Sequence, residues 1–364
     1  MRPSRSFLLL FLILICLTGL YFAFPSTGLF PSPDDFIPGS DRLYQARNKT
    51  DKADTVPEEQ PYLLVFDSIQ SPGTVVSSVY DTITGPLTPF FDSLKYPKKQ
   101  VRVLYYGDSQ LEGDRVTFYL RQLFRKEYGG TGPGLLLPVM PVMYTKSVWI
   151  RSSENWKRYN YLSYKSEEIE HTRFGPFMSF CRYMPEGFVS DIDEKAFVRI
   201  RPTGFADTAV SEFDNMRLFY SNPDGNVNLI VKSGDKILYN IILEQCSDIK
   251  EFTCNLNKAG EISLEFSGKS GPSVYGISIE SATGVIVDNI PQRGSAGLEF
   301  TLTDTATLRY FYDCLKPDLF ILQYGLNIVK NVRHDYSYYK KGLVRQIETL
   351  KQLSKGTPVI VVGV

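Results

Sequence analysis

The sequence predicts an α/β fold: a parallel sheet with crossover helices, interrupted by an inserted antiparallel β-sandwich and preceded by an N-terminal membrane anchor. Short apolar runs at residues 101–106 and 284–290 are followed by glycine-bearing turns, as expected for buried strands. Between these runs helical periodicity fades. Short β-like runs there alternate with turn signals at a spacing of roughly 8–12 residues, which favours a sandwich.

The N-terminus predicts export. Residues 7–24 carry no charge and follow Arg2 and Arg5. The stretch is at the short end of what spans a bilayer, and it is longer than the usual apolar core of a cleaved signal peptide. We therefore favour an uncleaved signal anchor over a cleaved signal. The protein is expected on the periplasmic or cell-surface face, membrane-anchored or secreted.

Composition excludes some classes of protein. Lys+Arg and Asp+Glu are both 40, which removes the electrostatic argument for nucleic acid. The 5 Cys are too few and too scattered for a disulfide scaffold, although Cys246 and Cys254 could either bridge neighbouring strands or remain free thiols. With 2 His and no CxxC, a structural zinc site is not expected, and neither is a cofactor.

The α/β part begins with the strand at 101–106 and an amphipathic helix at 113–128, which the glycines of "GGTGPG" end. That helix is expected to bury one apolar face and to place basic residues elsewhere: Val116, Leu120, Leu123 and Phe124 on the face, and Arg121, Arg125 and Lys126 away from it. After the strand at 284–290, a further strand at 318–327, a helix at 336–353 and a strand at 357–364 are expected.

The sandwich is expected from six β-like runs: "AFVRIRP", "MRLFYSN", "VNLIVKS", "KILYNIIL", "EISLEFSG" and "VYGISIES". The predicted organisation along the chain is a signal anchor or signal peptide (1–24), a flexible linker (25–60), the first part of the α/β domain (61–136), the inserted sandwich (137–280) and an incomplete second part of the α/β domain (281–364).

Small and polar residues follow three of the predicted parallel strands: Gly107-Asp108-Ser109, the turn at 294–297, and Gly325-Leu326-Asn327. Ligands bind beyond the carboxyl ends of such strands, so these turns should converge. A serine before a helix has an exposed hydroxyl, a glycine lets a backbone N–H approach, and an asparagine offers an amide. Together they suit attack on an ester and stabilisation of its oxyanion.

Plainer interpretations exist for the same residues. Ser109 could be only a helix N-cap, and Asn327 could be another. Gly294 and Gly297 could serve only a tight turn. Arg115 and Arg293 flank the site and could meet an anionic glycan, but surface arginines are more often solvated, so neither is assigned a role.

These blocks resemble those of a known family. "YYGDSQ", "IPQRGSAG" and "LQYGLN" are similar to the first, second and third blocks of the SGNH, or GDSL, hydrolases. The resemblance implies a three-layer, flavodoxin-like fold. It also implies that Ser109 is the nucleophile, that Gly297 is the backbone oxyanion donor and that Asn327 is the side-chain donor. Asp108 is then a supporting neighbour in the first block.

The sequence departs from that family in two places. The aspartate that normally follows the third-block asparagine is absent, and so is the Asp-x-x-His block that supplies the base. Neither His171 nor His334 has that context, and we expect the catalytic histidine to be absent from this chain. Because the chain ends on an apolar strand, we expect it to be a truncated version of a longer protein.

An inserted sandwich resembles the architecture of the peptidoglycan O-acetylesterases, whose added module is similar to carbohydrate-binding domains. The expected activity is removal of O-acetyl groups from a cell-wall or surface polysaccharide by a serine esterase, with an acetylated glycan as substrate. The expected membrane contact is the N-terminal helix. Three alternatives remain: an O-acetyltransferase on the same scaffold, a lipase or lysophospholipase, and a non-catalytic glycan-binding protein.

Overall fold

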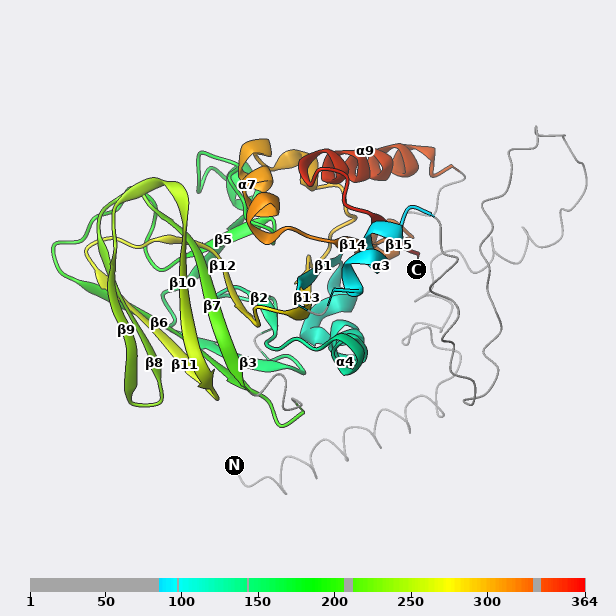
Figure 1. The fold of residues 1–364 in the computed structure, drawn as a ribbon. Helices are drawn as coiled ribbons and strands as arrows, with labels where there is room; N and C mark the ends of the chain where they lie inside the picture. Colours follow the sequence, from blue (N-terminus) through cyan, green and yellow to red (C-terminus); the bar gives the residue numbers. More distant parts are fainter. Residues whose placement is uncertain (1–84, 97, 143, 206–211, 330–334, 364) are drawn as a thin grey trace, which may run out of the picture. The chain divides into compact units, whose positions relative to one another are not determined.

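The computed structural model describes residues 85–364, apart from 97, 143, 206–211, 330–334 and 364 (Figure 1). All of these residues belong to one compact unit, Val75–Val364. The predicted anchor, the predicted linker and His334 lie outside the described residues. Within the ranges that are described, no helix is both long and apolar enough to span a membrane.

A parallel sheet forms the α/β part, in the order β13-β1-β14-β15. Its strands are β1 (Gln100–Gly107), β13 (Gly284–Pro291), β14 (Leu319–Gln323) and β15 (Val359–Val362), which confirms the four predicted strands. Gly107, at the end of β1, pairs with Pro291 on one side and with Gln323 on the other. The carboxyl ends of three adjacent strands are therefore level. Successive strands are added on one side of β1 and then on the other, and open α/β sheets bind ligands at such a change of direction.

Helices cover both faces of this sheet because successive strand residues point to opposite sides (Figure 1). Leu104 and Tyr106 belong to the cluster that includes α7 (Thr305–Leu315) and α9 (Ser337–Leu353). The alternate residues of β1 pack with α3 (Thr88–Leu94) and α4 (Thr117–Tyr128). Shorter helical segments complete the set: α5 (Tyr161–Lys165), α8 (Leu326–Val329) and η3 (Phe300–Leu302).

The chain between β1 and β13 forms two antiparallel sheets, in the orders β10-β7-β12-β5-β4 and β3-β6-β11-β8-β9, and β2 pairs with β12. Their strands are β2 (Gly134–Leu136), β3 (Val148–Ser152), β4 (Lys157–Asn160), β5 (Ser179–Arg182), β6 (Glu194–Pro202), β7 (Phe213–Asn222), β8 (Val227–Ser233), β9 (Lys236–Leu243), β10 (Cys246–Ala259), β11 (Ile262–Gly268) and β12 (Ser273–Glu280). All six predicted runs are strands. Tyr239 and Phe252 meet between the two sheets, with ring centroids 6.0 Å apart.

Helix α7 packs on both the parallel and the antiparallel parts. Its Phe311 meets Phe219 of β7 with ring centroids 5.5 Å apart, and its Tyr312 meets Phe320 of β14 at 5.2 Å. The two parts therefore share a continuous apolar core across this helix.

The start and the buried face of α4 differ from the prediction. The helix begins at Thr117, after the short 3₁₀ segment η2 (Ser109–Asp114), in which Gly113 has a φ of +71°. Arg121 and Arg125 are buried, whereas Leu123 is 66% exposed. Arg121 turns inward because it donates to the Val287 carbonyl of β13 at 2.8 Å and contacts Asp114 at 2.8 Å.

Of the two alternatives for Cys246 and Cys254, a disulfide or free thiols, the structure shows free thiols. Cys246 and Cys254 both lie in β10, so they cannot bridge two neighbouring strands as one alternative required. Cys181 and Cys314 are free as well.

Candidate active site at the carboxyl ends of the parallel strands

The three turns expected to converge do meet. The Asn327 amide donates to the Ser295 carbonyl at 2.8 Å and lies 3.5 Å from Asp108 Oδ2. Backbone bonds hold the same arrangement: Asp108 N–H donates to the Gln323 carbonyl at 3.3 Å, and Gln292 N–H donates to the Gly107 carbonyl at 2.7 Å. A Cβ at Gly107 would lie 2.9 Å from the Gln323 carbonyl oxygen, so only glycine fits between the strand ends.

Ser109 lies two residues after the end of β1, opens the segment η2 and is half-buried. The N-cap of the turn is Asp108, whose Oδ1 accepts from Gln110 N–H at 2.8 Å, so capping does not occupy Ser109. Among the described residues, neither the hydroxyl nor the N–H of Ser109 has a hydrogen-bond partner. The amphipathic helix does not begin behind this serine as expected, because η2 intervenes before Thr117. The helix dipole therefore contributes less at Ser109 than the sequence suggested.

Gly297 occupies a turn that requires glycine. Its φ is +75°, and a Cβ there would lie 2.5 Å from the Tyr324 ring. Its N–H, however, donates to Ser295 Oγ at 2.9 Å, and that hydroxyl donates to Glu299 Oε2 at 2.6 Å. The N–H expected to face an oxyanion is thus engaged within its own turn.

Asn327 is not a helix N-cap, because it lies inside the short helix α8. An amide carries two N–H donors. The Ser295 carbonyl takes one at 2.8 Å, while Asp108 is only a distant partner at 3.5 Å. The second N–H is available to a ligand oxygen.

An ion pair between a buried carboxylate and an exposed arginine, not foreseen from the sequence, joins the first two turns. Arg293 donates from Nε and Nη2 to the two carboxylate oxygens of Glu112, at 2.6 and 2.7 Å. Glu112 is 5% exposed, which makes the bidentate contact effective. Arg115 donates to the carbonyls of Glu112 and Ser109 at 2.7 and 3.1 Å. Both arginines set aside as surface residues therefore hold the turn that carries Ser109.

Neither the described histidine, His171, nor the buried phenol of Tyr324 is suited to act as the base. His171 Nδ1 accepts from Arg173 N–H at 3.3 Å, and its Nε2 lies 3.2 Å from Glu186, so both nitrogens face groups other than Ser109. Burial raises the pKa of Tyr324 well above its ordinary value, so its hydroxyl stays protonated and donates to Gln292.

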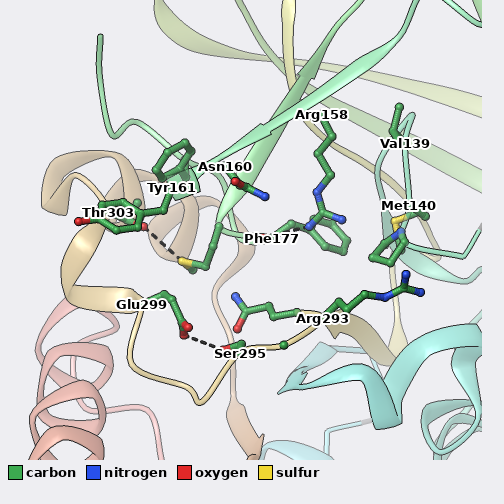
Figure 2. Close-up of a pocket in the computed structure, with 15 residues that line it drawn as sticks. Val139, Met140, Arg158, Asn160, Tyr161, Phe177, Arg293, Ser295, Glu299 and Thr303 are labelled. Atoms are coloured by element: carbon green, nitrogen blue, oxygen red, sulfur yellow. Dashed lines mark hydrogen bonds between the residues drawn. The ribbon is translucent and has the colours of Figure 1, made fainter. Parts of the chain in front are cut away.

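A cavity of about 460 Å³ lies beside the second turn (Figure 2). The turn contributes polar groups to it: Gln292, Arg293, Gly294, Ser295 and Glu299. The antiparallel part contributes apolar and aromatic side chains, among them Tyr161, Phe174 and Phe177, together with Arg158 and Asn160. In the part of the chain that the structure describes, no group of three or more potential ligands could hold a metal ion.

Comparison with known proteins shows the fold. No family model matches the sequence, and no curated protein matches it significantly. A solved structure of a peptidoglycan O-acetylesterase is 15% identical, covers 76% of this chain and 70% of its own, and has a TM-score of 0.56. The chain thus shares that structure's mixed α/β fold.

Two carbohydrate-binding modules also match part of the chain. A family 61 module bound to β-1,4-galactotriose is 10% identical, covering 36% of this chain and 85% of its own, with a TM-score of 0.22. A family 29 module is 11% identical, covering 43% and 89%, with a TM-score of 0.25. Scores this low support no conclusion about the fold or the ligand.

Proposed function

We propose that this protein is a serine esterase of the SGNH type, which removes O-acetyl groups from a cell-wall or surface polysaccharide. The observation that carries the proposal is the convergence of Ser109, the Ser295–Gly297 turn and Asn327 beyond three adjacent strands, with the Ser109 hydroxyl unbonded to any described residue. We further propose that the enzyme is exported and acts while held to the membrane by its N-terminal segment.

In the proposed reaction, Ser109 Oγ attacks the acetyl carbonyl carbon. The oxyanion accepts from the N–H of Ser109 and the second amide N–H of Asn327. Gly297 N–H joins them when the Ser295 hydroxyl turns away. The sugar hydroxyl leaves, and water then cleaves the acetyl-serine and releases acetate. The base that takes the Ser109 proton is a histidine that we expect to be absent from this chain, because neither His171 nor His334 has the Asp-x-x-His context.

A glycan-binding protein without esterase activity is the second candidate. Two observations favour it: Gly297 N–H is already bonded to Ser295, and no residue within the described ranges is hydrogen-bonded to the Ser109 hydroxyl. This candidate predicts glycan binding with no Ser109-dependent release of acetate.

The test is acetate release from an O-acetylated polysaccharide, with and without added imidazole as an external base. We expect release by the wild-type chain to exceed that by Ser109→Ala, and the excess to grow with imidazole. The rate measured with Ser109→Ala also serves as the background for hydrolysis by imidazole in solution and is subtracted from the wild-type rate. Ser166→Ala, at an exposed serine, is the matched control. Equal release by wild type and Ser109→Ala at every imidazole concentration would contradict the nucleophile assignment.

The same assay separates the other enzyme classes. Acetyl transfer to an added glycan acceptor in preference to water would identify a transferase. Faster cleavage of long-chain esters than of acetyl esters would identify a lipase. We expect neither, because the proposed reaction ends with water and the cavity beside the turn carries Arg158 and Asn160.

A further inference from the structure

Arg158, which is half-buried, differs from three fully buried arginines of the described chain. Arg102, Arg121 and Arg182 each have a carboxylate partner. Arg158 donates instead to neutral groups, to Ser179 Oγ at 2.9 Å and to the Phe177 carbonyl at 3.5 Å. Among the described residues, no carboxylate oxygen lies within 4.0 Å of its guanidinium.

The guanidinium lines the cavity beside the second turn. Figure 2 shows Arg158 extending from β4 into this space toward Arg293. Arg293 is already paired with Glu112, so Arg158 brings to the cavity a positive charge that has no carboxylate at ion-pair distance among the described residues. Burial lowers the pKa of Arg158, but an arginine remains charged at neutral pH. A half-buried guanidinium without an ion-pair partner can form a charge-assisted hydrogen bond with an anionic ligand.

The other walls suit a sugar. Tyr161, which is half-buried, offers an aromatic surface on which a sugar ring can pack, and the buried Phe174 and Phe177 lie in the apolar wall behind the cavity. Glu299 lies on the wall opposite Arg158, where its carboxylate can accept from sugar hydroxyls (Figure 2). A ligand that carries a carboxylate on one side and hydroxyls on the other matches this distribution of charge.

We propose that the cavity is a subsite for a carboxylate-bearing sugar of the glycan, whose carboxylate pairs with Arg158. This rests on the proposed function, because it places that sugar next to the ester presented to Ser109. The link to the reacting groups is Ser295, which lines the cavity, accepts from the Asn327 amide and holds Gly297 N–H. The substrate class is therefore an acetylated acidic polysaccharide containing uronic acid.

Binding is measured by calorimetry in a Ser109→Ala chain, so that turnover does not interfere. The probes are oligogalacturonate and oligoglucuronate, each compared with its methyl ester, which lacks the carboxylate charge and carries one additional methyl group. We expect the acids to bind about tenfold more tightly than the esters, as one charge-assisted hydrogen-bonded pair allows. Arg158→Gln should abolish this preference and Arg158→Lys should retain part of it. Arg199→Gln, at an exposed arginine of β6, should leave it unchanged.

Equal binding of acid and ester, no binding of either, or a preference that survives in Arg158→Gln would overturn the proposal. The comparison of acid with ester in the Ser109→Ala chain, which retains Arg158, does not depend on whether Arg158→Gln folds. The two proposals also fail separately. Acid-selective binding without Ser109-dependent acetate release would refute the proposed esterase activity and support the subsite. Ser109-dependent acetate release without acid selectivity would support the esterase activity and refute the subsite.

Discussion

Ser295 contacts three parts of the candidate site. Its carbonyl accepts from Asn327, its hydroxyl accepts from Gly297 N–H, and the same hydroxyl donates to Glu299. The carbonyl orients the asparagine, which suits the proposed reaction. The hydroxyl has the opposite effect, because it competes with an oxyanion for the Gly297 donor.

Ser295→Ala removes the competitor and leaves the backbone carbonyl in place. A neutral hydrogen bond contributes about 1 kcal/mol, so its absence should raise kcat for an acetyl ester about fivefold. The measurement is the initial rate of acetate release, at saturating substrate and fixed imidazole, for wild type and variant. A large fall in kcat would show instead that the Ser295 hydroxyl itself assists the reaction, and Gly297 would lose its assigned role.

At the scale of elements, α4 shows why a burial pattern read from sequence can be wrong. Apolar periodicity favoured Leu123 as a buried position, but it is Arg121 that points at the sheet. Its guanidinium bonds the Val287 carbonyl, Asp114 and Ser147. These partners belong to β13, η2 and the segment before β3, so no local pattern contains them.

Two substitutions on this helix should therefore differ sharply. Leu123→Gln, at a side chain that is 66% exposed, should change the free energy of unfolding by less than about 0.5 kcal/mol. Arg121→Gln should lower it by about 3 kcal/mol or more, because Asp114 is left buried without its charged partner. Urea unfolding of both variants measures the difference. A larger loss for Leu123→Gln than for Arg121→Gln would show that the helix is oriented as its periodicity predicted.

The strands that the sequence missed have a physical explanation. β4 and β5 are short and contain arginine or serine, so they hold too few residues for a period of two to be visible. β10 is long but lies at the end of its sheet, where many of its side chains face solvent and an apolar run is not required. By contrast, β14 was predicted because an inner parallel strand is apolar on both faces. β13 was predicted too, because it is buried along its whole length although it ends the sheet.

At the scale of the whole molecule, the sequence located the groups that follow strands but not those that support them. Ser109, Gly297 and Asn327 could be placed because the ends of parallel strands meet. The supporting groups are far apart in sequence and become neighbours only through the tertiary fold. Glu112 pairs with Arg293 in this way, and Arg158 comes to line the same cavity as Arg293. Pairings of this kind leave no local periodicity.

A buried cluster of charges joins the parallel and antiparallel parts. Arg102 of β1 contacts Asp288 of β13 at 2.8 Å and also pairs with Glu280 at the end of β12. Burial alone would raise the pKa of Glu280, but Arg102 and Arg217 outweigh it and hold the pKa at about 2. The pKa of Asp288 is raised by its burial, so the two carboxyls contribute with opposite signs.

The contribution of Glu280 can be isolated by its pH dependence. A folded pKa of about 2 against an ordinary value of 4.5 stabilises the folded state fully above pH 4.5, and this stabilisation is lost as the pH falls toward 2. The shift corresponds to about 3 kcal/mol. We expect wild type to exceed Glu280→Gln by about that free energy of unfolding at pH 7 and by progressively less at pH 4 and pH 3. Because Asp288 is present in both proteins, its opposing titration largely cancels in the difference. A difference that stays constant from pH 7 to pH 3 would mean that Glu280 holds the two parts together by packing and not by charge.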